Sequence, residues 1–288
     1  MKSTNVYEKR SAYLRLASAL AAVTLWLGMA ALPASAQSLA LAPAEVQYEF
    51  KPGQSFQFEL CVSNDGGAPA VMQVSVTDLW YNDKNEKLFG SPGSSPRSAA
   101  NWIEFVPRQF IAPAHGTGKV KVVVTPPLQA SGGYYAVVFV ESKPQLVQAA
   151  AEGKKAVFTN IRLGSLILLS AENTEDYRVD VSDVQFTPPS ASRSMKIDFL
   201  VSNRGNTHVF PEARVAILNS QHALIAKTES EIKRFLPQQS DRLSVDWAGT
   251  LPPGNYSAIL SVVYGEGKVY TREIPFTVPT PQLTAGRQ

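Results

Sequence analysis

The sequence is poor in the residues that most often build metal and catalytic centres, with one cysteine and three histidines among 288 residues. A single cysteine excludes an intramolecular disulfide framework and a cysteine-based zinc cage. Three scattered histidines leave little for metal binding or general-base chemistry. The composition therefore gives no positive support for an enzyme.

An excess of charge is also missing once the first 36 residues are set aside. The whole chain has 27 Lys and Arg against 24 Asp and Glu. Residues 1–36 hold four of the basic residues and one acidic residue, so 23 of each remain in 37–288. A neutral chain with interspersed charges lacks the basic surface of a nucleic-acid binder. We expect no nucleic-acid partner.

The first 36 residues have the three parts of a secretory signal peptide. A basic segment precedes the uncharged apolar run 16–32, and Ala34-Ser35-Ala36 supplies the small residues of a cleavage site. The run is shorter than the roughly 20 residues of a membrane span, which favours cleavage over an uncleaved anchor. We expect an exported protein, located in the periplasm or else secreted or at the cell surface, without an integral membrane segment in the mature chain.

Short alternating runs dominate the remainder of the chain, and helical periodicity is almost absent. Residues 56–62, 71–76 and 195–199 alternate apolar and mostly polar side chains, and Gly, Pro, Asn and Asp clusters separate such runs. This pattern is typical of an all-β protein. The continuous apolar run 134–140 predicts a strand that is buried on both faces.

An internal repeat divides the chain into two similar units. FELCVSNDGG (58–67) matches IDFLVSNRGN (197–206), and PPLQASGGYYAVVFV (126–140) matches LPPGNYSAILSVVYG (251–265). The repeat predicts two tandem immunoglobulin-like β-sandwich domains. We place the signal peptide at 1–36, the domains at 38–170 and 176–279, and a flexible tail at 280–288.

Motifs that would carry chemistry fail on inspection. Gly116-Thr117-Gly118-Lys119 lacks the first Gly and the final Ser or Thr of a phosphate-binding loop. Residues 82–86 lack the spacing of a calcium loop and are better explained as a hairpin turn. His115, His208 and His222 are interpreted as solvated loop residues. We therefore predict no catalytic residue, no metal site and no cofactor.

The apolar segment 157–169 is the candidate binding element. It follows a long loop, 142–156, and is predicted to form one long strand with alternating side chains. This strand could simply complete the sheet of the first domain, or it could also expose a backbone edge to a partner's strand. The candidate partner-binding residues are Val157, Ile161, Arg162, Leu163, Ile167 and Leu169.

The order of these features resembles that of the periplasmic pilus-assembly chaperones (PapD-like) over nearly all of 38–279. The resemblance rests on the signal peptide, FELCVSNDGG, WIEFVP (102–107) with Phe110 and Pro113, the strand 119–124, the long loop and the strand 157–169. It implies two domains set at an angle, and donation of the first domain's last strand to a pilus subunit without ATP or a cofactor.

The resemblance also implies two basic residues in the inter-domain cleft, one in the first strand and one in the last strand of domain one. Residues 37–50 contain no Lys or Arg, and Arg162 is the only basic residue of the last strand. In the second domain, LPPGNY (251–256) and VVYG (262–265) are more weakly similar to the sandwich domains of extracellular WxL-interacting proteins.

Two functional hypotheses follow. The first is a non-enzymatic exported chaperone or assembly factor for surface fibres or pili, which binds a secreted subunit by β-strand complementation. The alternative is a soluble cell-surface adhesion or scaffold module that binds protein or polymer through the loops 82–98 and 142–156. The sequence does not predict an oligomeric state.

Overall fold

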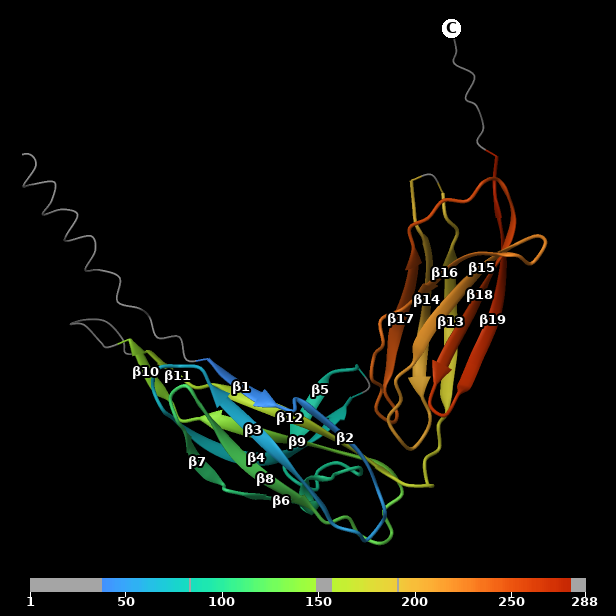
Figure 1. Ribbon diagram of the computed structural model, residues 1–288. Helices are drawn as coiled ribbons and strands as arrows, with labels where there is room; N and C mark the ends of the chain where they lie inside the picture. The colour runs from blue at the N-terminus through green and yellow to red at the C-terminus, as the bar shows by residue number, and fades with distance from the viewer. Residues whose placement is uncertain (1–37, 83, 149–156, 191, 281–288) are drawn as a thin grey trace, which may run out of the picture.

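Two β-sandwiches account for the residues that the computed structural model describes, which are 38–82, 84–148, 157–190 and 192–280 (Figure 1). One turn of 3-10 helix, Ala100–Trp102, is the only helical element among them. The prediction of an all-β protein with two tandem sandwiches is confirmed. Nothing in the described ranges forms a helix that is long and apolar enough to cross a membrane.

The first sandwich consists of one sheet in the order β1-β3-β8-β6 and a second in the order β2-β12-β9-β4-β5, with β7 also paired to β4. A separate two-stranded ribbon, β10-β11, continues beyond β9 and β12. The strands are β1 Leu39–Ala42, β2 Glu45–Phe50, β3 Phe56–Asn64, β4 Ala70–Tyr81, β5 Lys87–Gly90, β6 Ile103–Val106, β7 Gln109–Ala112, β8 Gly116–Val124, β9 Gly132–Ser142, β10 Gln145–Gln148, β11 Val157–Thr159 and β12 Arg162–Ala171.

The second sandwich has sheets in the orders β13-β14-β17 and β16-β15-β18-β19. Figure 1 shows it standing at a wide angle to the first. Its strands are β13 Val179–Thr187, β14 Met195–Asn203, β15 Glu212–Asn219, β16 Leu224–Glu229, β17 Ser240–Trp247, β18 Gly254–Tyr264 and β19 Lys268–Val278.

The asparagine of the Val-Ser-Asn repeat forms the same buried hydrogen-bond network in both domains. Asn64 and Asn203 are fully buried, and each side-chain amide ties down the turn that follows its strand. The nitrogen donates to the carbonyl four residues on and to a carbonyl of a distant segment, and the oxygen accepts from the N–H two residues on. These distances are 2.9, 3.1 and 3.0 Å at Asn64 and 2.8, 3.1 and 2.9 Å at Asn203.

The prediction of one continuous strand over 157–169 is wrong. β11 ends at Thr159, β12 begins at Arg162, and the two pair with different strands. Between the two ladders the register shifts by one residue, because Lys143 and Pro144 lie opposite the single residue Asn160. Proline has no N–H to donate, which explains why the ladder is interrupted there.

The prediction that the run 134–140 is buried on both faces is confirmed. Ala136 and Val138 lie in the core between the sheets. Tyr135 and Val137 point to the outer face, where the second domain contributes Leu236 to the same cluster. The second domain thus packs against the outer face of this sheet. This explains why apolar side chains on β9 do not alternate with polar ones.

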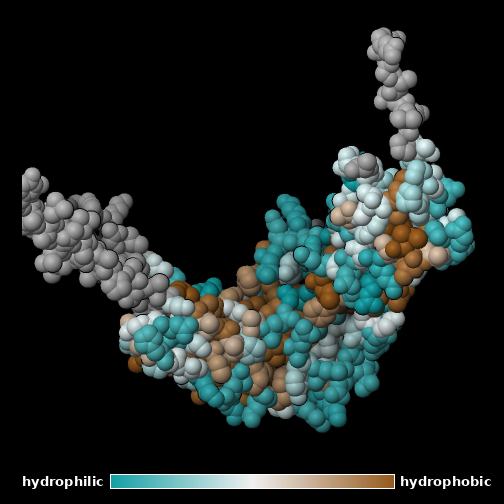
Figure 2. Space-filling view, turned by 45° about the horizontal axis from the view of Figure 1, so that its top comes forward, coloured by the Kyte–Doolittle hydropathy of each residue, from teal (hydrophilic) through white to brown (hydrophobic). Residues whose placement is uncertain are grey.

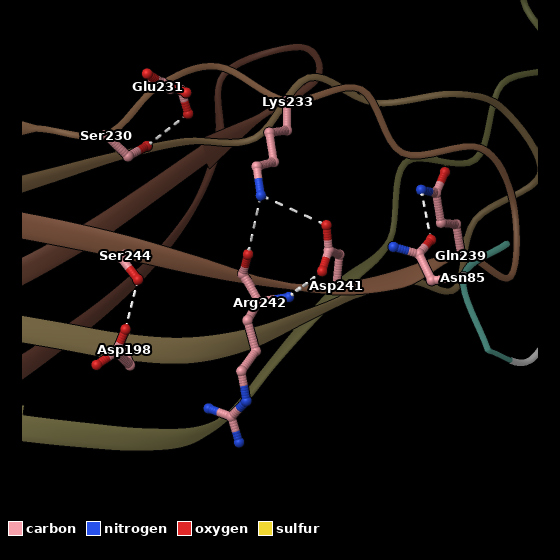
Figure 3. Close-up of polar contacts among 9 residues, drawn as sticks. All are labelled: Asn85, Asp198, Ser230, Glu231, Lys233, Gln239, Asp241, Arg242 and Ser244. Atoms are coloured by element: carbon pink, nitrogen blue, oxygen red, sulfur yellow. Dashed lines mark hydrogen bonds and ion pairs between the residues drawn. The ribbon is translucent and has the colours of Figure 1, made fainter. Parts of the chain in front are cut away.

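Polar contacts flank this apolar junction of the domains. Arg234 of the second domain forms an ion pair with Glu45 on β2. At the tip of the β4–β5 hairpin, Asn85 accepts a 2.8 Å hydrogen bond from Gln239, and Figure 3 shows these two side chains pointing at each other. The junction therefore holds the outer sheet of domain one at both of its margins.

His208 also belongs to this junction, and its interpretation as a solvated loop residue is wrong. Its ring packs edge-on against Tyr135 and Phe210, at 5.8 and 5.6 Å between centroids. Burial, and then the nearby charge of Arg234, lower the pKa of His208 to about 4, while Glu45 opposes this change. A loop residue of one domain is here covered by the other, which the local sequence does not reveal.

We predict that Asn64→Ala and Asn203→Ala each lower the free energy of unfolding of their domain by about 2–4 kcal/mol, because three hydrogen bonds are lost and buried carbonyls are left without donors. Urea denaturation of each variant measures the change. Asn255→Ala, which alters an exposed side chain bonded only to Thr277 among the described residues, should stay within about 0.5 kcal/mol. Equal losses at all three positions would contradict the account.

We also predict that acid weakens the protein through His208. The unfolded histidine takes up a proton as the pH falls below about 6.5, whereas the folded one resists protonation until its pKa near 4. Stability that is present above pH 6.5 is therefore lost as the pH falls toward 4, by at most about 3 kcal/mol. Denaturation curves at pH 7 and pH 4.5 measure this loss.

The matched variants for this test are His208→Gln and His222→Gln. The first removes the buried titrating group and should reduce the loss between pH 7 and pH 4.5. The second changes an exposed histidine and should leave it unaltered. An identical loss in the wild-type protein and in His208→Gln would show that His208 does not carry the effect.

Candidate partner-binding site

The two sides of β12 are covered to different extents. On one side β9 pairs with it antiparallel over its whole length, from Arg162 to Ala171. On the other side β2 pairs with it in parallel only from Leu166 to Ala171. Among the described residues, no strand pairs with the segment 162–165 on that side.

The N-terminal segment leaves this gap because it changes sheets. Continued in the register of β2, the chain before Glu45 would place Leu41 beside Arg162. Leu41 instead pairs with Val62 of β3 in the opposite sheet. The chain crosses between the sheets at Pro43, whose carbonyl oxygen accepts a 2.8 Å bond from the Ser165 hydroxyl.

The hydrogen-bond pattern shows which backbone groups face the gap. Leu166 donates its N–H toward the β2 side, to Ala44, whereas the carbonyl oxygen of Ile161 accepts from Ser142 on the β9 side. Backbone groups alternate along a strand. The N–H and C=O groups of Arg162 and Gly164 therefore point out of the sheet at its open edge.

The predicted partner-binding residues divide into two groups. Ile167 and Leu169 are fully buried in the core of the first domain, so they have no surface to offer. Ile161 and Leu163 are half-buried, and Arg162 is exposed. Val157 lies in β11, and its side chain falls outside the described part of the structure.

Arg162 lies across the outer face of the sheet. Its guanidinium carbon is 3.8 Å from the centroid of the Phe139 ring, and its Nε is 3.6 Å from a carboxylate oxygen of Glu141. Both charged side chains are well exposed to solvent, so the ion pair contributes little to stability. The stacking fixes the direction of the side chain, and no described residue accepts a hydrogen bond from its backbone N–H.

Gly164 packs closely against the same aromatic ring, Phe139. A Cβ atom at this position would lie 2.9 Å from Cε1 of Phe139, closer than real Cβ contacts allow. The ring therefore covers the glycine on β12, its cross-strand neighbour. Sequence analysis did not select Phe139 or Gly164, although both lie in segments that it did single out.

Apolar side chains continue from this point over the outer face of the sheet. Phe89 on β5 packs edge-on against Phe139 at 5.5 Å and is 51% exposed. Leu166 and Tyr81 are half-buried on the same side. Figure 2 shows brown, apolar side chains across the face of the first domain that turns toward the second. The open edge of β12 thus borders an apolar surface.

The cleft differs in charge from the two-arginine-or-lysine arrangement that the resemblance implies. The segment that would carry the first basic residue forms β1 and β2 and contains no Lys or Arg, and its Glu45 forms an ion pair with Arg234 of the second domain. No group of three or more His, Cys, Asp or Glu side chains is arranged to hold a metal ion within the described residues.

No protein-family model matches the sequence, and no curated protein matches it. Solved structures do match. They include a chain of the chaperone–tip adhesin complex of CFA/I fimbriae (14% identity, 84% of this chain and 100% of the other, TM-score 0.46) and the class 5 fimbriae chaperone CfaA (13%, 85% and 100%, 0.45). A chain of the Salmonella enterica SafA pilin–SafB chaperone complex also matches (14%, 84% and 96%, 0.41). Each of these matches spans most of this chain and nearly all of the other chain.

Proposed function

We propose that the protein is a non-enzymatic exported chaperone or assembly factor for surface fibres or pili, which binds a secreted subunit by β-strand complementation. The proposal rests on one observation, the open backbone edge of β12 at residues 162–165 beside half-buried Ile161 and Leu163. Its place of action is the periplasm or the cell surface.

An added strand obtains affinity from main-chain hydrogen bonds and specificity from alternate side chains. Arg162 and Gly164 offer two N–H donors and two carbonyl acceptors at the open edge. At a net 0.5–1.5 kcal/mol each, four such bonds contribute about 2–6 kcal/mol. Covering Ile161 and Leu163 adds apolar burial, each by less than the roughly 1.5–3 kcal/mol of a fully buried side chain because both are already half-covered.

The open edge is short and guarded, as expected for one that must not pair at random. Natural sheets protect exposed edges with charges and by keeping them short. Here Arg162 supplies the charge, and the crossing at Pro43 limits the edge to four residues before β2 covers β12. A partner strand entering from the 162 end would stop at β2, which defines its register.

The alternative, binding through loops, finds less support. The tip of the loop 82–98 is bonded to the second domain through Asn85. Farther along, Ser94, Ser95 and Ser98 donate hydrogen bonds to the buried carboxylate of Asp78. These polar groups are engaged within the molecule. The loop 142–156 lies largely outside the described residues.

We predict that the double variant Ile161→Asp/Leu163→Asp loses its partner. Two carboxylates at the edge would have to be desolvated on contact with an apolar strand, at a cost of several kcal/mol. Affinity purification from an envelope extract, followed by mass spectrometry, measures the amount of co-purified subunit. A decrease of at least about tenfold is expected.

The matched control is Thr271→Asp, an exposed position on β19, the last strand of the second domain. It should co-purify the same amount of subunit as the wild-type protein. The denaturation midpoint of the second domain should be unchanged in both variants. Unchanged co-purification by the double variant would remove the basis of the proposal.

A second prediction separates backbone pairing from side-chain contact. Arg162→Pro removes one N–H from the open edge and none from the ladder with β9, since the Arg162 N–H points away from β9. We expect the proline variant to lose most of its bound subunit, and Arg162→Ala, which keeps the N–H, to lose much less. Equal binding by the two variants would show that the strand edge is not used.

A further inference from the structure

A pocket lies between the two domains on the side of the outer sheet away from β12. It has a volume of about 600 Å³, within the range of small-molecule sites. The end of β4, the loop 94–97 and the start of β9 line it from the first domain, and residues 236–238 line it from the second. Since β9 separates β4 from β12, the pocket is distinct from the open edge of β12.

The inner part of the pocket is apolar and aromatic. Leu79, Tyr135 and Leu236 are nearly fully buried and belong to one cluster, which forms its floor. Trp80 and Tyr134, both half-buried, also line the pocket, and Tyr134 packs against Trp102 in the core of the first domain. Floors of this kind hold flat or bulky apolar groups, while a few placed polar groups decide which molecule fits.

Arg97 is the only charged residue among those that line the pocket. Both of the hydrogen bonds that its guanidinium makes to described residues leave from Nη1, to the carbonyl oxygens of Ser131 and Gly133 at 3.2 Å. No carboxylate of the described chain lies within ion-pair distance of it. The Nε and Nη2 donors thus remain for a ligand, and two bonds hold the side chain in place.

No other charged group among the described residues of either domain competes with an anion for Arg97 in the pocket. Asp78 lies behind the loop 94–97, where its carboxylate is fully buried and accepts bonds from serines of that loop. The positive charge of Arg97 reaches the floor, since it opposes the burial that raises the pKa of Tyr135. On the side of the second domain, Leu236, Pro237 and Gln238 bring no charge.

We propose that this pocket binds a small organic anion with an aromatic or bulky apolar body. Arg97 would pair with the anionic group, and the Ser131 hydroxyl and the Gln238 amide would donate further hydrogen bonds. The apolar body would lie on the floor that Leu79, Tyr135 and Leu236 form. A charged guanidinium in a partly desolvated site favours an anion over its neutral analogue. Because the pocket is shared by both domains, an occupant also stabilises their arrangement.

The test uses two probes of nearly equal shape, 1-naphthoate and its neutral analogue 1-naphthamide. Isothermal titration calorimetry on the full mature protein at pH 7 measures both affinities. We expect the anion to bind at least about tenfold more tightly than the amide, and to raise the melting temperature of the protein. If neither probe binds at millimolar concentration, or if both bind equally well, the proposal is wrong, and no variant is needed to show it.

Variants locate the site. Arg97→Gln should abolish the preference for the anion, Arg97→Lys should retain part of it, and Ser131→Trp, which fills the rim, should weaken both probes. The matched control is Arg108→Gln, since Arg108 stacks on Phe105 outside the pocket and should bind both probes as the wild type does. An anion preference that persists in folded Arg97→Gln, or that is lost in Arg108→Gln, would contradict the assignment. These outcomes leave the open edge of β12 untouched, so they are distinguishable from the subunit-binding test.

Discussion

A β-sheet that does not close into a barrel has two edge strands, and the unpaired backbone N–H and C=O groups of those strands need either water or a partner. This constraint shapes the first domain. Its N-terminal segment pairs with both sheets in turn, β1 with β3 and β2 with β12. One short segment cannot cover both edges over their full length. The part of β12 before Leu166 is consequently left open, and the proposed binding of a partner strand depends on that gap.

The second domain is held by apolar burial more than by its polar contacts. Leu236, Leu168 and Tyr135 are almost fully removed from solvent at the junction. Each such side chain contributes about 1.5–3 kcal/mol by burial, whereas a hydrogen bond such as that between Gln239 and Asn85 contributes about 1 kcal/mol. The flanking ion pair and hydrogen bond mainly select the orientation in which the apolar surfaces meet.

Much of the fold could be predicted from the sequence because the two domains repeat one pattern. The Val-Ser-Asn match identified strands that end in the same buried asparagine hydrogen-bond network. The apolar run 134–140 indicated a strand covered on both faces. Such features are local: strand periodicity and turn residues suffice to find them.

The site could be predicted only in part, because it depends on tertiary pairing. Sequence alternation selected Ile161 to Leu163 but could not show that Ile167 and Leu169 are core residues, since apolar side chains look alike whether they face the interior or a partner. The sheet crossing at Pro43 and the covering of His208 by another domain both arise from contacts distant in sequence.

Amide hydrogen exchange, resolved by residue in the free protein and in its complex with the captured subunit, tests the central claim most directly. In the free protein the amides of Arg162 and Gly164 should exchange rapidly, because they point out of the open edge, while those of Leu163 and Ser165 should be protected by β9. In the complex all four should be protected. Rapid exchange of Arg162 and Gly164 that persists in the complex would contradict binding by strand complementation.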